Sequence, residues 1–136
     1  MESKKVILDT NLWISFLISK KLNALDSLLN EGKIVLVFSD ELIEEFVKVI
    51  TRPKFRKYFS TNDVKRILDC FDQFGKLIKV KSDVRICRDE KDNFLLNLAI
   101  DSKAHYLITG DGDLLVLNQI KNTRILTFAD FMGVIS

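Results

Sequence analysis

Hydrophobic and polar residues alternate along the chain in blocks whose spacing switches between that of strands and that of helices. Short continuous apolar runs, such as residues 34–38, are typical of strands buried in a parallel sheet. Apolar residues spaced three and four apart indicate one buried helix face. The pattern predicts strands over 5–8, 34–38, 77–80, 105–109 and 124–127, and helices through 12–17, 22–29, 42–50, 61–74, 92–103, 114–117 and 128–134.

This alternation of strands and helices predicts one α/β domain over residues 1–136, since no repeat, low-complexity tract or linker interrupts it. We expect a parallel sheet of about four to five strands with helices on both faces. In such sheets, ligands bind at the carboxyl ends of the strands.

Composition narrows the class of protein. With 47% hydrophobic and 29% charged residues, the chain is expected to fold, because disorder needs low hydrophobicity and high net charge. No apolar run is long enough to span a membrane and no signal-peptide pattern is present, so a cytoplasmic protein without membrane contact is the default expectation. Two scattered cysteines, Cys70 and Cys87, and one histidine, His105, offer too few ligands for a zinc site. His105 opens an apolar strand and is expected to be structural.

Carboxylates are the reactive groups that the chain has in quantity. Asp9 ends the first predicted strand and Asp111 follows the strand at 105–109, so both would face one crevice if these strands are central and parallel. Asp92 begins a predicted helix, and Glu45 lies inside another. Mg²⁺ and Mn²⁺ prefer oxygen ligands, and a carboxylate site that holds them suits hydrolysis of phosphodiester bonds.

Each acid also has a simpler explanation. Asp9 and Asp92 stand where side chains cap helices, and Asp111 lies between two glycines in a turn-like string. Glu44 and Glu45 flank opposite edges of the same apolar helix face, so the helical wheel does not choose between them, and either could simply be solvated.

Taken together and in order, the acids and their neighbours resemble the four motifs of the PIN-domain family. The first motif is a strand that ends in Asp-Thr-Asn. The second places its functional glutamate six residues after a serine, which selects Glu45 over Glu44. Four motifs in order are far more specific than one Asp-Thr-Asn alone. The matching segments are 6–11, 39–46 with 49–55, 89–95 and 104–115.

The resemblance implies a Rossmann-like fold and endonucleolytic cleavage of RNA that depends on Mg²⁺ or Mn²⁺. It covers nearly the whole chain. It implies that the motif acids are catalytic and bind the metal, that Asp113 is a further ligand, and that two polar residues assist by hydrogen bonding. The motif acids are Asp9, Glu45, Asp92 and Asp111, and the assisting residues are Asn11 and Thr109.

Within the family the sequence is similar to the VapC-like ribonucleases, the toxin components of bacterial and archaeal toxin–antitoxin pairs. The string Arg-Pro-Lys-Phe at residues 52–55 is typical of that group. This finer resemblance implies a small antitoxin protein as partner and a homodimer. A housekeeping role in RNA processing is the alternative for the same chemistry.

The net charge of +2 alone implies no nucleic-acid partner, but four cations fall within residues 52–57. Arg52, Lys54, Arg56 and Lys57 could bind the RNA backbone, or they could form a solvated loop. A phosphate-binding role predicts that RNA binding weakens steeply with salt.

Other carboxylate enzymes fit less well. A haloacid-dehalogenase-like phosphatase would need a second Asp two residues after Asp9, where this chain has Asn11. A receiver domain would need paired acids at the end of the first strand, where there is one. The remaining alternative is a PIN-fold module that binds RNA or protein without cleavage, against which the four retained acids count.

Overall fold

The computed structural model describes residues 3–19, 23–55, 57–60, 75–87 and 92–135, together with residues 62, 65, 68, 69, 72 and 73. The helix predicted over 61–74 lies largely outside the described residues and stays a prediction. Arg56, Cys70 and the charged loop predicted at 88–91 also lie outside them.

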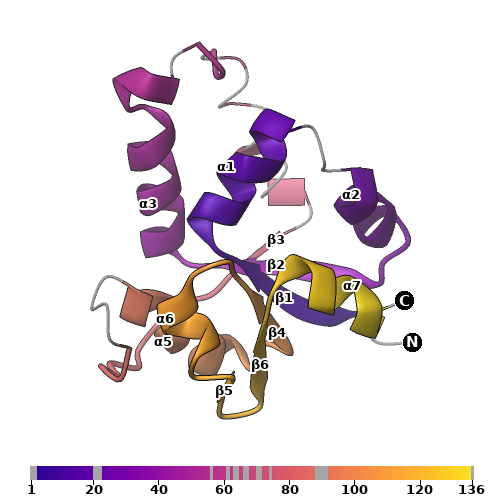
Figure 1. The fold of residues 1–136 in the computed structure, drawn as a ribbon, viewed down its shortest axis with the longest axis vertical. Helices are drawn as coiled ribbons and strands as arrows, with labels where there is room; N and C mark the ends of the chain where they lie inside the picture. The colour runs from indigo at the N-terminus through magenta and orange to yellow at the C-terminus, as the bar shows by residue number, and fades with distance from the viewer. Residues whose placement is uncertain are drawn as a thin grey trace.

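The described elements follow the predicted alternation of strands and helices (Figure 1). Their bounds are β1 Lys4–Leu8, α1 Thr10–Ser19, α2 Asn23–Asn30, β2 Ile34–Phe38, α3 Asp40–Ile50, a 3-10 turn at Pro53–Phe55, β3 Gly75–Leu77, α5 Asn93–Ser102, β4 Tyr106–Ile108, α6 Gly112–Leu115, β5 Gln119–Ile120, β6 Thr123–Leu126 and α7 Phe128–Ile135.

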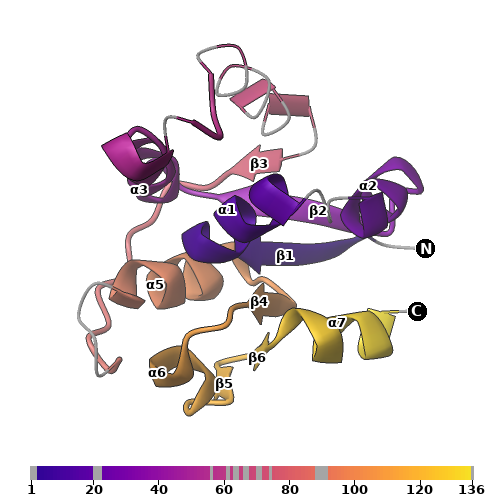
Figure 2. The same ribbon diagram turned by 45° about the horizontal axis from the view of Figure 1, so that its top comes forward.

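The sheet has six strands in the order β3-β2-β1-β4-β6-β5, and every described pair is parallel except β5 with β6. The chain moves outward from β1 through β2 to β3 and then returns to β4 on the other side of β1. Because crossovers between parallel strands are right-handed, this reversal places α1 and α3 on one face and α5 on the other (Figures 1 and 2). The predicted α/β class is confirmed. The sheet has more strands than the predicted four to five.

The core lies where the continuous apolar runs predict it. Strands β1, β2 and β4 are central in the sheet, and Val6, Leu36 and Leu107 on them are almost fully buried. Both faces of such strands are covered, which is why the runs do not alternate with polar residues. None of the helices that the structure describes is long and apolar enough to cross a bilayer.

Helix α3 begins as predicted. Ser39 follows β2, and its buried Oγ accepts a hydrogen bond of 3.2 Å from the backbone N–H of Leu42. This cap satisfies one of the donors that the first turn leaves without a partner. The helix buries Leu42 and Phe46 and packs against both α1 and α5. Pro53 follows its end, as expected.

The prediction of a strand over 77–80 is wrong. Strand β3 ends at Leu77, and beyond it only the backbone N–H of Ile78 still pairs with β2, through Phe38 O. Residues 81–87 run alongside α5, and side chains of that helix bind their backbone. The backbone therefore finds its hydrogen bonds on a helix surface instead of in the sheet.

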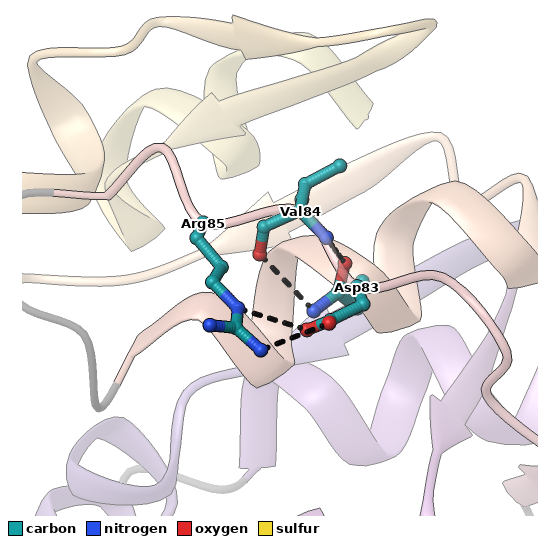
Figure 3. Close-up of polar contacts among 4 residues, drawn as sticks. Asp83, Val84 and Arg85 are labelled. Atoms are coloured by element: carbon teal, nitrogen blue, oxygen red, sulfur yellow. Dashed lines mark hydrogen bonds and ion pairs between the residues drawn. The ribbon is translucent and has the colours of Figure 1, made fainter.

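The side chains responsible stand four residues apart on α5, which places them in one row along the helix. Asn97 Oδ1 accepts from Val84 N at 2.7 Å, while Asn97 Nδ2 donates to Val84 O at 3.4 Å. Asn93 Oδ1 accepts from Cys87 N, and Asp101 accepts from the N–H groups of residues 81 and 82. We call Asn93, Asn97 and Asp101 the polar row (Figure 3 shows Val84 of the bound segment, with Asp83 and Arg85).

Two smaller differences concern the last third of the chain. Helix α6 begins two residues earlier than predicted, because Asp111 caps it. Strand β5 was not predicted, since its two residues are too few to form an apolar run. It turns back on β6 through Lys121, whose φ of 50° is left-handed.

The structural role expected for His105 is confirmed. Its ring Nδ1 accepts a hydrogen bond of 3.0 Å from the backbone N–H of Lys5, and its backbone N–H donates to Lys5 O. The residue thus helps to align β4 with β1.

Candidate active site

Asp9 is placed at the carboxyl edge of the sheet by the two strands that flank it. Its N–H donates to Ile108 O on β4, and its carbonyl accepts from Leu12 N and Trp13 N, which starts α1. The residue is 7% exposed. Its carboxylate is therefore fixed between the end of a strand and the first turn of a helix.

Thr109 joins this carboxylate to the second predicted acid. It is completely buried, and its Oγ1 donates a hydrogen bond of 2.7 Å to Asp9 Oδ2. The same oxygen accepts from the backbone N–H of Asp111 at 3.0 Å. Because β1 and β4 are adjacent and parallel, the residues that follow them meet at one edge. We call Asp9 and Asp111 the acid pair and Thr109 its bridging threonine.

Burial raises the pKa of Asp9 above its ordinary value. The hydrogen bonds from Thr109 and Asn11 lower the pKa, while the nearby Asp111 carboxylate raises it. The net shift is upward, so the folded protein holds the ionised form of Asp9 at a cost. A cation placed between the two carboxylates would relieve both the desolvation and the repulsion.

A cleft of about 410 Å³ opens onto this pair and is lined by Asp9, Asn11, Leu12, Ser15, Gly110 and Asp111. Leu12 and Ser15 were not among the site residues predicted from the sequence. Ser15 stands one turn after Asn11, and that spacing was the available signal. Thr10 is also buried, and its Oγ1 has no hydrogen-bond partner among the described residues.

The two remaining motif acids lie on helices that approach this edge. Glu45 is half-buried on α3 and Glu44 is exposed, so the structure distinguishes two positions that the helical wheel left equal. Asp92 precedes α5 and makes no capping hydrogen bond with its side chain, so the simple capping explanation is wrong for it. Helix α3 packs against α1 and α5, which brings the three helices together beside the strand ends (Figure 2).

For Asp111 and Asp9, the explanation that each acid caps a helix or a turn holds in part. Asp111 does cap α6, since its Oδ1 accepts from Asp113 N at 2.9 Å. Asp9 accepts a long hydrogen bond of 3.4 Å from Asn11 N. Asp113 is half-buried and is not among the residues that line the cleft.

The acids are less closely grouped than four ligands of one ion would be. Within the described part of the chain, no three Asp, Glu, His or Cys side chains are arranged to hold a metal ion together. The acid pair nevertheless fits Mg²⁺, which keeps several waters and is commonly held by one or two carboxylates. The cleft beside the pair provides space for an ion with its waters.

A second cleft, of about 390 Å³, lies between α3, α5 and the segment bound by the polar row. Glu41, Asp83 and Arg85 contribute its charged side chains. Asp83 and Arg85 form an exposed ion pair of 3.1 Å (Figure 3). None of the four motif acids lines this cleft, so it lacks the chemistry of the first.

A mostly parallel α/β sheet with a buried and a half-buried acid at its carboxyl edge is typical of carboxylate-site proteins, a class that includes nucleases. Comparison with known proteins narrows the class. Residues 5–113 match the model of the PIN domain family, and the chain belongs to that family. PIN domains are generally nucleases and generally bind divalent metals.

One curated relative carries no known function. The chain is 38% identical over 116 residues to the uncharacterized protein MJ1680 of Methanocaldococcus jannaschii. The match covers 83% of this chain and 74% of that protein. The name of that protein assigns it no activity or substrate.

Proposed function

We propose that the protein is an endoribonuclease that depends on Mg²⁺ or Mn²⁺. One observation carries the proposal. Thr109 links the carboxylate of Asp9 to the backbone of Asp111, both acids line an open cleft at the ends of adjacent parallel strands, and the burial of Asp9 makes its charge costly unless a cation is near. Such a site suits binding of a cation together with a phosphate.

In this proposal Asp9 and Asp111 would hold the ion. A bound divalent ion supplies charge for the scissile phosphate and lowers the pKa of a water. Thr109 orients the Asp9 carboxylate through its hydroxyl and favours the ionised form. Leu12 and Gly110 line the same open cleft, through which a phosphodiester could approach the pair.

The family pattern supports roles for the other predicted residues. By the order of the motifs, Glu45 and Asp92 would bind the ion directly or through water, and α3, which carries Glu45, packs against α1 and against α5, which Asp92 precedes. Asn11 lines the cleft and could hydrogen-bond to the substrate. Asp113 is a candidate for binding through water, since its backbone is tied to Asp111.

We further propose that this nuclease is the toxin of a toxin–antitoxin pair, acts as a homodimer and is held inactive by a small antitoxin. The support is the resemblance of residues 52–55 to that group. An adjacent gene for a short protein that copurifies with this chain and inhibits cleavage would favour this role. A housekeeping nuclease would have neither property.

The test is cleavage of end-labelled RNA by purified protein with Mn²⁺ or Mg²⁺, with and without EDTA. Asp9→Asn should abolish cleavage, and Asp83→Asn, which alters the second cleft, should cleave like the wild type. Cleavage that survives Asp9→Asn would refute the assigned site. A folded wild type that binds RNA without cutting it would instead identify a binding module.

A further inference from the structure

The longest stretch of the sequence without acids includes the turn that follows α3, which carries the aromatic residues Phe55, Tyr58 and Phe59. Between Glu45 and Asp63 the sequence has five cations and no carboxylate: Lys48, Arg52, Lys54, Arg56 and Lys57. In the described part of this stretch, Arg52, Lys54 and Lys57 are exposed, and no ion pair with a described carboxylate involves them. Their charge is therefore available to a partner.

The turn is anchored from within by two aromatic side chains. Phe55 and Phe59 are half-buried against the core, and their ring centroids are 6.3 Å apart. Backbone hydrogen bonds from Tyr58 N and Phe59 N to Phe55 O hold the turn together. The inner face of the segment is thus apolar and packs against the core.

The outer face combines cations with one aromatic ring. Tyr58 is 48% exposed, so its ring is accessible to a ligand. The Lys57 ammonium lies 5.1 Å from the Tyr58 ring centroid, and Lys54 lies 5.0 Å from that of Phe55. A π-face and positive charges adjoin on a rigid turn, and unpaired nucleotides present bases beside phosphates in the same way.

We propose that residues 52–55 and 57–59 form a docking surface for single-stranded RNA, with Tyr58 stacking on a base and Arg52, Lys54 and Lys57 neutralising phosphates. This inference rests on the proposed ribonuclease function. Duplex RNA hides its bases in the stack, so the exposed ring favours the single strand. An acidic protein segment would use the cations but would have no comparable use for the ring.

The distance from the cleft sets the kind of substrate. The turn follows the end of α3 that points away from the acid pair (Figure 1), and the 11 residues of α3 are roughly 16 Å long at 1.5 Å per residue. A mononucleotide cannot reach both places. The surface would therefore bind an oligonucleotide whose scissile bond lies several nucleotides from the stacked base.

The experiment is fluorescence anisotropy with labelled oligouridine and a duplex RNA of equal length, in EDTA so that no cleavage occurs. Tyr58→Leu keeps apolar bulk without the aromatic face and should weaken single-strand binding by about tenfold or more. Tyr58→Phe should bind like the wild type. Lys57→Gln should lower the slope of log affinity against log salt by about 0.7, while Lys4→Gln, at the amino-terminal end of the central strand β1, should leave binding unchanged.

Single-strand affinity that is equal in the wild type, Tyr58→Leu and Tyr58→Phe would overturn the inference, and so would a wild type that binds no single-stranded RNA. Melting temperatures near that of the wild type exclude unfolding as the cause of a loss. Adding Mn²⁺ to the same oligonucleotide tests the nuclease separately. Cleavage without a Tyr58 effect refutes the docking surface alone, and a Tyr58 effect without cleavage refutes the proposed nuclease alone.

Discussion

The acid pair and the polar row both hold carboxylates close to the backbone, yet the two regions affect them in opposite ways. Desolvation raises the pKa of Asp9, and the hydrogen bonds it receives do not compensate. Asp101 also loses some hydration, but hydrogen bonds from Ser82 and Lys81 outweigh this loss and lower its pKa. Both regions are built from hydrogen bonds, so their difference lies in burial and in the neighbouring charge.

The comparison distinguishes a carboxylate that stabilises the folded state, Asp101, from one that destabilises it when ionised, Asp9. A lowered pKa means that ionised Asp101 stabilises the folded state at neutral pH, and a raised pKa means that ionised Asp9 destabilises it. A protein retains such a cost where the charge has a use. The polar row is thus a structural device, and the acid pair is a candidate for chemistry.

The largest effect is expected from removing the hydroxyl that bridges the acids. Thr109→Val keeps the shape but deletes the hydrogen bond to Asp9, and loss of such a supporting contact commonly costs about 10–100-fold in activity. Because that bond lowers the pKa of Asp9, its loss should also move the acid limb of the pH–rate profile to higher pH. Initial rates of RNA cleavage across pH measure both changes.

Thr123→Val is the matched control for Thr109→Val. Thr123 is equally buried, and its Oγ1 donates to Ala104 O at 2.6 Å, away from the cleft. It should lose stability but keep the wild-type pH profile. Similar pH–rate profiles for Thr109→Val and Thr123→Val would show that both threonines affect only the stability of the fold.

A smaller effect is expected in the polar row. Asn97→Ala leaves the backbone N–H and C=O of Val84 without their partner, which should cost roughly 1–3 kcal/mol of the free energy of unfolding. Urea denaturation measures this change, and Asn122→Ala, at an exposed position in the β5–β6 turn, serves as the control. Equal stability of both variants would mean that the segment 81–87 does not depend on the row.

The smallest effect concerns Asp101 and pH. Its lowered pKa adds stability above the unfolded value of about 3.9, and that stability is lost as pH falls through the folded value. Asp101→Asn should therefore be less stable than the wild type at pH 6, by under about 1 kcal/mol because the group is largely solvated. The difference should shrink as the pH falls below the unfolded value and vanish below the folded value, and a difference that is constant with pH would refute the assigned cause.

The sequence predicted the parts of the fold that depend on periodicity. The apolar runs located β1, β2 and β4, and alternation with helices predicted the parallel order that joins Asp9 to Asp111. The polar row was missed because Asn93 and Asn97 interrupt an apolar helix without showing what they bind, although their spacing of four was visible. The strand predicted over 77–80 was misplaced, because β3 ends at Leu77 and the apolar residues Ile78 and Val80 resemble a strand whether or not the strand continues.

The sequence predicted the positions of some acids of the site better than those of others. Sheet topology alone places Asp9 and Asp111, since residues after adjacent parallel strands must meet. For Glu45 and Asp92, the positions depend on how α3 and α5 pack and on the rotamers of long or terminal side chains, which periodicity does not determine. Their contribution to metal binding therefore rests on the family motif.

Binding of Mn²⁺ tests the central claim most directly, because it needs neither the RNA target nor the partner. Calorimetry should show binding to the wild type, at least about tenfold weaker binding to Asp111→Asn, and unchanged binding to Asp130→Asn, which alters an exposed acid on α7. Equal Mn²⁺ affinity in all three proteins, or no binding to the folded wild type, would contradict the assignment of the acid pair as a metal site.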